Sequence, residues 1–390
     1  MKTYNELRKV NGGGDKKRSM DLCFICGKPL TKENASDEHI ILNALGGHLH
    51  SRKLLCKTCN SKMGQASDAE LSKELEFAAS FLDIKRQRGE NQVIQTHEDE
   101  LYDMGPGGKP VLKKPVVHHE KLESGLVKVE MKTRSMEEAK RILKGLKKTY
   151  PVLDVEEALK TAKPQKKYLG KRIGMEMKID GPRIFPSVTK SVLEFYLLRG
   201  GERSQIVSLI PYVMGEAESD CCWYYYPPQP LVEKQEREIF HVLYVVGDPK
   251  EQILYGYMEL FGILQCMVCL NDHYTGADFC ESYGYDVVKA EEIKLDIKAR
   301  YSKEELQHIL KDRPAEWTQD LFNHMRIFLK KADDIVRETV RDKMLDRAIE
   351  NSFKKHPEGI PITEEMMQEF LGELEKELIP WYVSRMVKND

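Results

Sequence analysis

Two Cys-x-x-Cys pairs constrain the N-terminal part of this chain more than any other feature. Cys23 and Cys26 form the first pair, and Cys56 and Cys59 form the second. A Cys-x-x-Cys turn presents two thiolates to one ion, and a tetrahedral Zn²⁺ takes four such soft ligands. A segment this short cannot bury a large core, so a structural zinc would take the place of one. The pattern predicts that residues 21–66 fold around a single zinc ion.

The expected compartment agrees with metal binding by these thiols. The N-terminal residues contain no apolar stretch of the kind found in secretory signals. No apolar run reaches the roughly 20 residues that cross a bilayer. We therefore expect a cytoplasmic protein that makes no membrane contact, and the reducing cytoplasm favours metal binding over disulfides.

The remaining cysteines lie far downstream, at Cys221, Cys222, Cys266, Cys269 and Cys280. The last three, with His273, offer the alternative of a second zinc site. We expect buried free thiols instead, because Cys266 and Cys269 lie in an apolar, strand-like run that points them to opposite faces.

An acidic–histidine segment, Asp37, Glu38 and His39, lies between the two cysteine pairs. A zinc ribbon alone needs no such segment, whereas a hydrolase does. An imidazole with a pKa of about 6.5 can take a proton from water at neutral pH, and a carboxylate can hold a hard cation such as Mg²⁺. Asn60 directly follows the second cysteine pair and would place a neutral oxygen ligand at the start of a helix.

The order Cys-x-x-Cys, Glu-His-Ile, Gly-Gly and Cys-x-x-Cys-Asn over residues 21–66 resembles a zinc-stapled variant of the HNH endonuclease family. In that family a β-hairpin and a helix hold one divalent metal. The resemblance implies that His39 is the general base and that Glu38 and Asn60 bind a catalytic Mg²⁺ or Mn²⁺. Asp37 is either a substitute for Glu38 or a supporting residue beside it.

Two departures from the family pattern bear on the site. Ser51 stands where the family has the Asn that orients the base, and Glu38 stands where Asp is more common. Ser51 could orient the base less firmly, and the longer Glu38 side chain could shift the metal. His48 and His50 follow the double glycine, where they either support the site or are merely solvated.

A basic surface accompanies these residues. Its members are Arg52, Lys53, Lys57 and Lys62. They suit a phosphate backbone, although a solvated charged face is the alternative. Because the formal net charge of the whole chain is only -2, charge within segments says more than the total. Residues 128–190, including the cluster at 163–172, are rich in Lys and Arg. They indicate either a second nucleic-acid surface or a helix face mixed with Glu.

The rest of the chain predicts a multidomain α+β protein. We expect a flexible basic leader at 1–20, the nuclease domain at 21–88, an irregular linker at 89–123, a mixed α+β domain at 124–300 and a helical region at 301–390. Ser67 is the predicted N-cap of a helix over 67–88. Ser135 with Glu138 predicts a capping box for a helix over 135–148, and Asp154 precedes a short helix. Strands are predicted at 205–213, 238–246 and 252–270.

These features predict a metal-dependent endonuclease whose first candidate substrate is double-stranded DNA, and the resemblance implies products with 5′ phosphates. Two alternatives remain: a non-catalytic zinc-dependent nucleic-acid-binding protein, and an RNA-cleaving enzyme that uses the same site. The downstream domain could bind a small nucleotide activator, and the C-terminal helices fit a homo-oligomer. By analogy with other fusions of HNH modules, a bacterial anti-phage or restriction role is a further hypothesis.

Overall fold

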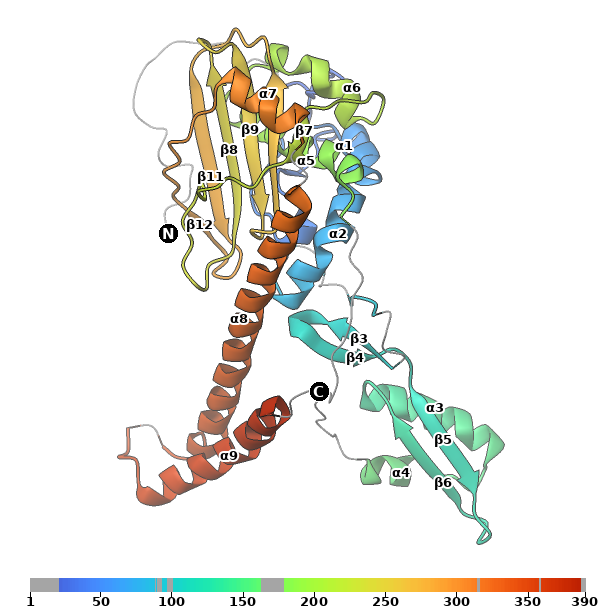
Figure 1. Cartoon of the computed structure of the whole chain (residues 1–390). Helices are drawn as coiled ribbons and strands as arrows, with labels where there is room; N and C mark the ends of the chain where they lie inside the picture. Colours follow the sequence, from blue (N-terminus) through green and yellow to red (C-terminus); the bar gives the residue numbers. More distant parts are fainter. Residues whose placement is uncertain are drawn as a thin grey trace.

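A computed structural model describes residues 21–87, 89, 93–96, 101–162, 179–313, 316–357 and 359–386. The predicted leader at 1–20 and the basic cluster at 163–172 lie outside the described residues. Figure 1 shows a body built on one large sheet, from which a small lobe and a pair of long helices extend. The mixed α+β class predicted from the sequence is confirmed.

The body contains a six-stranded antiparallel sheet in the order β12-β11-β8-β9-β10-β7. Its strands are β7 (Cys222–Tyr224), β8 (Phe240–Asp248), β9 (Ile253–Leu260), β10 (Leu264–Asn271), β11 (Phe279–Asp286) and β12 (Glu291–Ile293). Gly262, with a φ of 73°, makes the tight turn between β9 and β10. The strand predicted at 238–246 is confirmed, and the run predicted at 252–270 forms two strands, β9 and β10.

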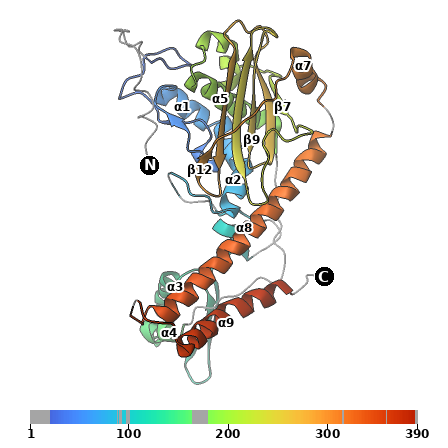
Figure 2. The same cartoon turned by 90° about the vertical axis from the view of Figure 1, so that its left-hand side faces the viewer.

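Both faces of this sheet are covered, and α5 (Gly181–Leu198) lies on one side while α7 (Lys303–Lys311) lies on the other (Figure 2). Side chains of β8 alternate between the two cores, because successive strand residues point to opposite faces. Leu243 belongs to the core that includes α5, and Val242 belongs to the core that includes α7. The same alternation separates Cys266 from Cys269, as their spacing predicted.

The N-terminal segment contains β1 (Glu38–His39), β2 (His50–Ser51), α1 (Lys57–Gly64) and α2 (Ser67–Phe81). Apolar residues of this segment, such as Ile40 and Leu71, belong to the same buried cluster as Val188 of α5. The hairpin and both helices therefore share one hydrophobic core with a face of the large sheet.

The helix predicted over 67–88 is shorter than expected. α2 ends at Phe81, and Asp83 follows with a φ of 50°, which a continuing helix does not allow. Ser67 is not the N-cap: Ala66 holds that position and provides no side-chain hydrogen bond. The turn at the end of α1 leads directly into α2, so little chain remains between the helices to place a capping side chain.

A second correction concerns residues 205–213, which do not form a strand. They contain parts of the 3₁₀ turns η4 (Arg203–Gln205) and η5 (Val207–Leu209), followed by α6 (Ile210–Val213). Pro211 explains this outcome, because proline fits the first turn of a helix but cannot donate to a strand ladder.

The lobe is built from hairpins and two short helices. Its elements are β3 (Tyr102–Gly105), η3 (Pro106–Gly108), β4 (Lys109–Leu112), β5 (Val116–Lys121), β6 (Val127–Lys132), α3 (Met136–Thr149) and α4 (Val155–Thr161). The stretch 89–123, expected to be a loop or an irregular β segment, contains paired strands. A small separate core forms around Leu143, Leu153 and Val155.

The caps predicted for α3 and α4 are found in part. Ser135 Oγ accepts the backbone N–H of Glu138 at 3.1 Å, and Asp154 caps α4. The reciprocal half of the capping box is replaced, because Glu138 Oε2 accepts the N–H of Arg134 instead.

The C-terminal region is helical, as predicted. α8 (Trp317–Phe353) runs away from the body, and α9 (Glu364–Met386) packs against its far end (Figures 1 and 2). Ion pairs join the two helices, including Arg347 with Glu377 at 2.7 Å. Within the described ranges, none of the helices has the length and apolar character needed to cross a membrane.

Candidate functional site

The hairpin β1–β2 carries the acidic–histidine segment. The strands are antiparallel, with Glu38 opposite Ser51 and His39 opposite His50. Residues that face each other across an antiparallel pair share one side of it, so the two histidines lie together. Their ring centroids are 5.5 Å apart.

The double glycine between these strands has a steric role. Gly46 adopts a φ of 82°, a value that glycine reaches without strain. At Gly47, a Cβ would lie 1.8 Å from the carbonyl oxygen of Ile41. No other residue fits there unless the backbone moves, which explains why the sequence needs glycine at this point.

The four N-terminal cysteines converge beside the hairpin. The Sγ atoms of Cys23, Cys26, Cys56 and Cys59 all lie within 4.8 Å of one another, and those of Cys26 and Cys56 are 3.9 Å apart. Four thiolates at 2.3 Å from a tetrahedral Zn²⁺ would be about 3.8 Å apart. The donor set and its spacing fit a structural zinc, as the sequence predicted.

Arg203 of η4 fixes the first cysteine turn from outside. Its guanidinium donates to the carbonyl oxygens of Phe24 at 2.6 Å and Ile25 at 3.2 Å. The sequence pattern gave no signal for this contact, since the two segments are distant in the chain.

His39 lies on the open side of the hairpin and contacts Gln87, which sequence reasoning did not single out. His39 Nε2 and Gln87 Oε1 are 2.9 Å apart. Gln87 Nε2 also reaches Nδ1 of His48 at 3.4 Å, and its backbone N–H donates to Asn43 Oδ1 at 3.0 Å. When the Gln87 amide donates to His48, its oxygen accepts from His39 Nε2–H. The nitrogen of neutral His39 that can accept a proton is then Nδ1.

His50 and Asp37 form a second polar pair on this side. His50 Nδ1 lies 2.8 Å from Asp37 Oδ1. The hydrogen bond from His50 lowers the pKa of Asp37, with a smaller opposing effect of burial. His48 stacks on Tyr285 of β11 with ring centroids 4.8 Å apart, and burial lowers its pKa.

Glu38 points the other way, into the core. Its carboxylate Oε1 accepts a 2.7 Å hydrogen bond from Lys190 Nζ of α5, and Lys190 also donates to Asp68 Oδ2 at 2.6 Å. Asp68 Oδ1 accepts from Ser187 at 2.5 Å. Burial raises the pKa of Glu38, and the nearby Lys190 opposes that rise. Burial likewise disfavours the charged form of Lys190, but the surrounding carboxylates outweigh it and raise its pKa.

Glu194 lies one helical turn beyond Lys190 and is fully buried. Among the described residues, neither carboxylate oxygen of Glu194 has a hydrogen-bond partner. Burial raises the pKa of Glu194 well above its usual value, and the neighbouring Lys190 opposes that rise. A lysine and a glutamate spaced four apart in the apolar run IFPSVTKSVLEFYLL were a signal that the sequence offered.

The two residues assigned to a catalytic metal each make other contacts in the structure. Glu38 is only 3% exposed and faces Lys190. Asn60 lies on α1, and its amide Nδ2 donates to Ser36 Oγ at 2.6 Å. Ser51, opposite Glu38, accepts the backbone N–H of Lys53 at 3.2 Å. In this arrangement Glu38 and Asn60 do not fit an exposed cation.

Residues 23–76 match the family model described as HNH endonuclease. They form an HNH endonuclease domain. The match runs from the first cysteine of the cluster into α2, so this HNH domain contains the hairpin, the four thiols and Asp68. The resemblance stated from the sequence is thereby confirmed. An HNH domain implies an enzyme that acts on nucleic acid with a metal ion. Neither the comparison with curated proteins nor that with solved structures gives a match.

The basic residues predicted to contact nucleic acid surround the HNH hairpin and α1. Arg52, Lys53, Lys57 and Lys62 are all exposed to solvent. Arg52 makes a 3.4 Å hydrogen bond to the carbonyl oxygen of Lys32. The positive charges of this surface are therefore open to a polyanion.

His241 of β8 supports the HNH domain from the sheet and was missed from the sequence. It is fully buried, and its Nε2 donates to the carbonyl oxygen of Leu45 at 2.8 Å. Its Nδ1 accepts the N–H of Phe261 at 3.4 Å. Burial lowers the pKa of His241 to about 4, so it is neutral at physiological pH.

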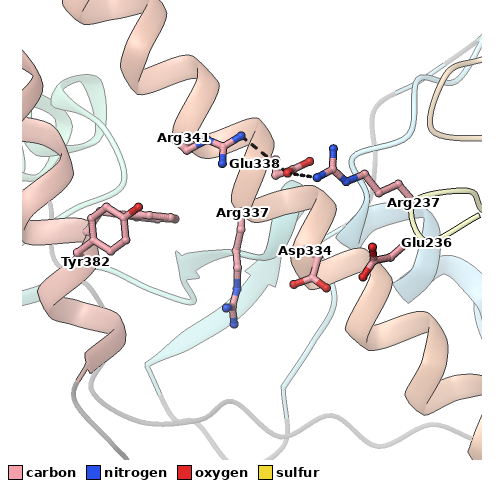
Figure 3. A pocket seen from close by; sticks show the side chains of 8 residues that line it. Glu236, Arg237, Asp334, Arg337, Glu338, Arg341 and Tyr382 are labelled. Atoms are coloured by element: carbon pink, nitrogen blue, oxygen red, sulfur yellow. Dashed lines mark ion pairs between the residues drawn. The ribbon is translucent and has the colours of Figure 1, made fainter.

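A separate cavity of about 340 Å³ lies between α8, α9 and the segment before β8 (Figure 3). Its lining residues are Glu236, Arg237, Asp334, Arg337, Glu338, Arg341, Trp381 and Tyr382. Glu338 pairs with Arg237 from one side and Arg341 from the other (Figure 3). Acidic and basic groups balance in this cavity, and it lies on other elements than the HNH hairpin.

Proposed function

We propose that this protein is a metal-dependent endonuclease that hydrolyses phosphodiester bonds of double-stranded DNA. The observation that carries the proposal is the open side of the HNH hairpin, where His39, His50 and Asp37 lie together beside the four-cysteine cluster. This places a base and a carboxylate next to exposed positive charges, which a phosphodiesterase needs.

His39 is the proposed general base. Its Nε2 is engaged by Gln87 at 2.9 Å, so Nδ1 takes the proton from the attacking water. Removal of that proton generates the nucleophile as it attacks phosphorus, and the P–O3′ bond breaks, so that the 3′ oxygen leaves and takes a proton from water. Gln87 orients the ring, a role that the family resemblance implied for the position of Ser51. His48 supports the same arrangement through its contact with Gln87.

A divalent cation such as Mg²⁺ or Mn²⁺ would neutralise charge on the scissile phosphate when bound. The sequence assigned this cation to Glu38 and Asn60, which the buried position of Glu38 does not favour. No step of the proposed mechanism is therefore routed through those two residues.

DNA is the proposed substrate because two exposed basic surfaces suit a duplex backbone. The first comprises Arg52, Lys53, Lys57 and Lys62 beside the hairpin. The second lies on α3 of the lobe, where Lys144, Lys147 and Lys148 are exposed and form no ion pair with other described residues. Phosphate contacts of this kind give affinity without base specificity.

The proposal includes an activator, an oligomeric state and a biological role for the nuclease. The cavity of Figure 3 is the proposed site of a small nucleotide activator, whose base would stack on Trp381 or Tyr382. The exposed apolar residues Leu345, Leu371 and Val383 on α8 and α9 suit a homo-oligomer. A cytoplasmic anti-phage or restriction role fits such a gated nuclease.

The test is plasmid cleavage with Mg²⁺ or Mn²⁺ by the zinc-loaded chain and by His39→Ala. We expect nicking or linearisation by the wild type only, with equal zinc content in both proteins. Binding without cutting would favour the zinc-dependent binding protein. Cleavage of RNA and not DNA would favour the RNA-cleaving enzyme.

A further inference from the structure

We propose that the divalent cation of the nuclease binds Asp37 and His50 on the open side of the hairpin, and that Glu38 is a positioning residue that acts through Lys190. The inference rests on the proposed function for its role in catalysis, although the binding site itself can be tested without DNA. Glu38, the acidic residue of the Glu-His pair, is then not a metal ligand but a residue that holds β1 in place.

Glu38 already has a buried partner, Lys190. Its side chain is 4% exposed, and that of its partner Lys190 is 1% exposed. A cation that reached this carboxylate would have to enter the core beside a buried ammonium group at 2.7 Å. Two positive charges on one carboxylate in a dry environment repel each other, so the buried ammonium group of Lys190 disfavours a second cation on Glu38.

Asp37 and His50 lie at the separation of two neighbouring ligands of one metal ion. Asp37 Oδ1 and His50 Nδ1 are 2.8 Å apart, and their side chains are 27% and 45% exposed. Two ligand atoms at right angles around an ion, each about 2.1 Å away, are about 3.0 Å apart. A cation bound to both atoms would displace the proton that now joins them, with both side chains turned towards the ion and His50 in its Nε2–H tautomer.

The location suits catalysis by the adjacent base. The His39 ring lies 5.5 Å from that of His50, on the same side of the hairpin. Two protein ligands leave the remaining coordination positions for water and phosphate oxygens, the usual arrangement when a cation is shared with a phosphate substrate. A water on the cation and a phosphate beside it would both be near His39.

The ligand pair also selects among cations. Carboxylate oxygen suits Mg²⁺ and Mn²⁺, whereas imidazole nitrogen suits the later transition metals. Because one ligand is of each kind, we expect this site to bind Mn²⁺ more tightly than Mg²⁺.

Glu38 then has a mechanical role. It precedes His39 directly in β1, and its bond to Lys190 holds that strand against α5. Asp68 shares the same ammonium group at 2.6 Å, which ties α2 to the same point. Glu38 therefore fixes where His39 stands without touching the reacting atoms.

The experiment measures Mn²⁺ binding to the zinc-loaded full-length chain in the absence of DNA, by the decrease of the free Mn²⁺ electron paramagnetic resonance signal. Wild type is compared with Asp37→Asn, His50→Gln and Glu38→Gln, all close in shape to the native residues. Zinc content and the thermal unfolding midpoint are recorded for each. We expect Asp37→Asn and His50→Gln to weaken Mn²⁺ at least about tenfold, with unfolding midpoints near that of the wild type. Glu38→Gln should keep the Mn²⁺ affinity and lower the unfolding midpoint.

Loss of Mn²⁺ binding in Glu38→Gln would overturn the reassignment, whatever the other variants do. Unchanged binding in Asp37→Asn and His50→Gln would overturn the proposed site. Because DNA is absent, either result is distinct from failure of the nuclease function, which the plasmid assay measures. A chain that binds Mn²⁺ through Asp37 and His50 without cutting would retain the site and lose the function.

Discussion

Lys190 of α5 donates a hydrogen bond of 2.7 Å to Glu38, the residue immediately before the proposed base. The ammonium group also bonds Asp68 of α2. One buried cation thus joins the HNH hairpin, the following helix and the helix on the large sheet. Buried charges are tolerated only while their partners are in place, so the position of the hairpin depends on α5.

Replacing Lys190 with Met should strongly destabilise the protein, because it leaves Glu38 and Asp68 buried with no counter-charge. Removing one member of a buried ion pair costs about 3–5 kcal/mol. Urea unfolding of Lys190→Met against wild type at pH 7 measures this. Lys250→Met, at an exposed position, is the matched control and should change little. A loss below about 1 kcal/mol would mean that Lys190 contributes no more than a surface ion pair.

The sequence predicted the local parts of the site and missed those made by distant segments. The four cysteines and the double glycine were predictable because ligand spacing and tight turns are properties of neighbouring residues. The direction of Glu38 was not, since it depends on which helix packs behind β1.

The same reason explains the fold. The strands β8 to β10 and the long C-terminal helices follow from periodicity within each segment. The prediction of a strand at 205–213 was wrong because of Pro211. Proline disfavours a central strand through a local effect, so the sequence itself contained the information needed to avoid this error. That the HNH domain shares a core with the sheet depends on packing between α2 and α5, which no local pattern encodes.

The four-cysteine cluster should hold one zinc ion per chain, and removing a ligand should unfold the hairpin region. Cys56→Ser is expected to lose the zinc and to lower the thermal unfolding midpoint, because a small metal site supplies folding energy to a segment with little core. Elemental analysis and calorimetry measure both. Cys280→Ser, at an exposed downstream thiol, should keep full zinc content. Equal zinc in the two variants would contradict the assignment.

Acid should destabilise the contact between the sheet and the HNH domain through His241. Burial lowers its pKa from 6.5 to about 4 in the folded protein. Between these values the unfolded chain binds a proton that the folded chain does not, so stability falls as pH falls from 6.5 towards 4. At about 1.4 kcal/mol for each pH unit, the loss reaches about 3 kcal/mol by pH 4.

His241→Gln provides the comparison, because glutamine can still donate to the Leu45 carbonyl but does not titrate. The stability difference between wild type and His241→Gln should shrink by about 3 kcal/mol between pH 7.5 and pH 4. A constant difference across this range would show that His241 is not buried in its neutral form.

Charge reversal on α3 should weaken DNA binding without affecting the HNH site. Lys144, Lys147 and Lys148, the residues of the proposed surface, are all exposed on α3, and Gly145 beside them has open space where a Cβ would stand. Three phosphate contacts would contribute about 2.7 to the slope of log affinity against log salt. The triple variant Lys144→Glu, Lys147→Glu and Lys148→Glu is therefore expected to show a smaller slope by that amount.

The control is a second triple variant, Lys250→Glu, Lys294→Glu and Lys298→Glu, which makes the same change in charge on another surface. These three lysines are exposed near the sheet. If the lobe binds the backbone, only the α3 variant loses the slope, and its Mn²⁺ affinity stays that of the wild type. If both variants lose affinity equally, net charge alone explains the effect. In that case the lobe is not a DNA-binding surface, and the lysines of α3 are an ordinary solvated helix face.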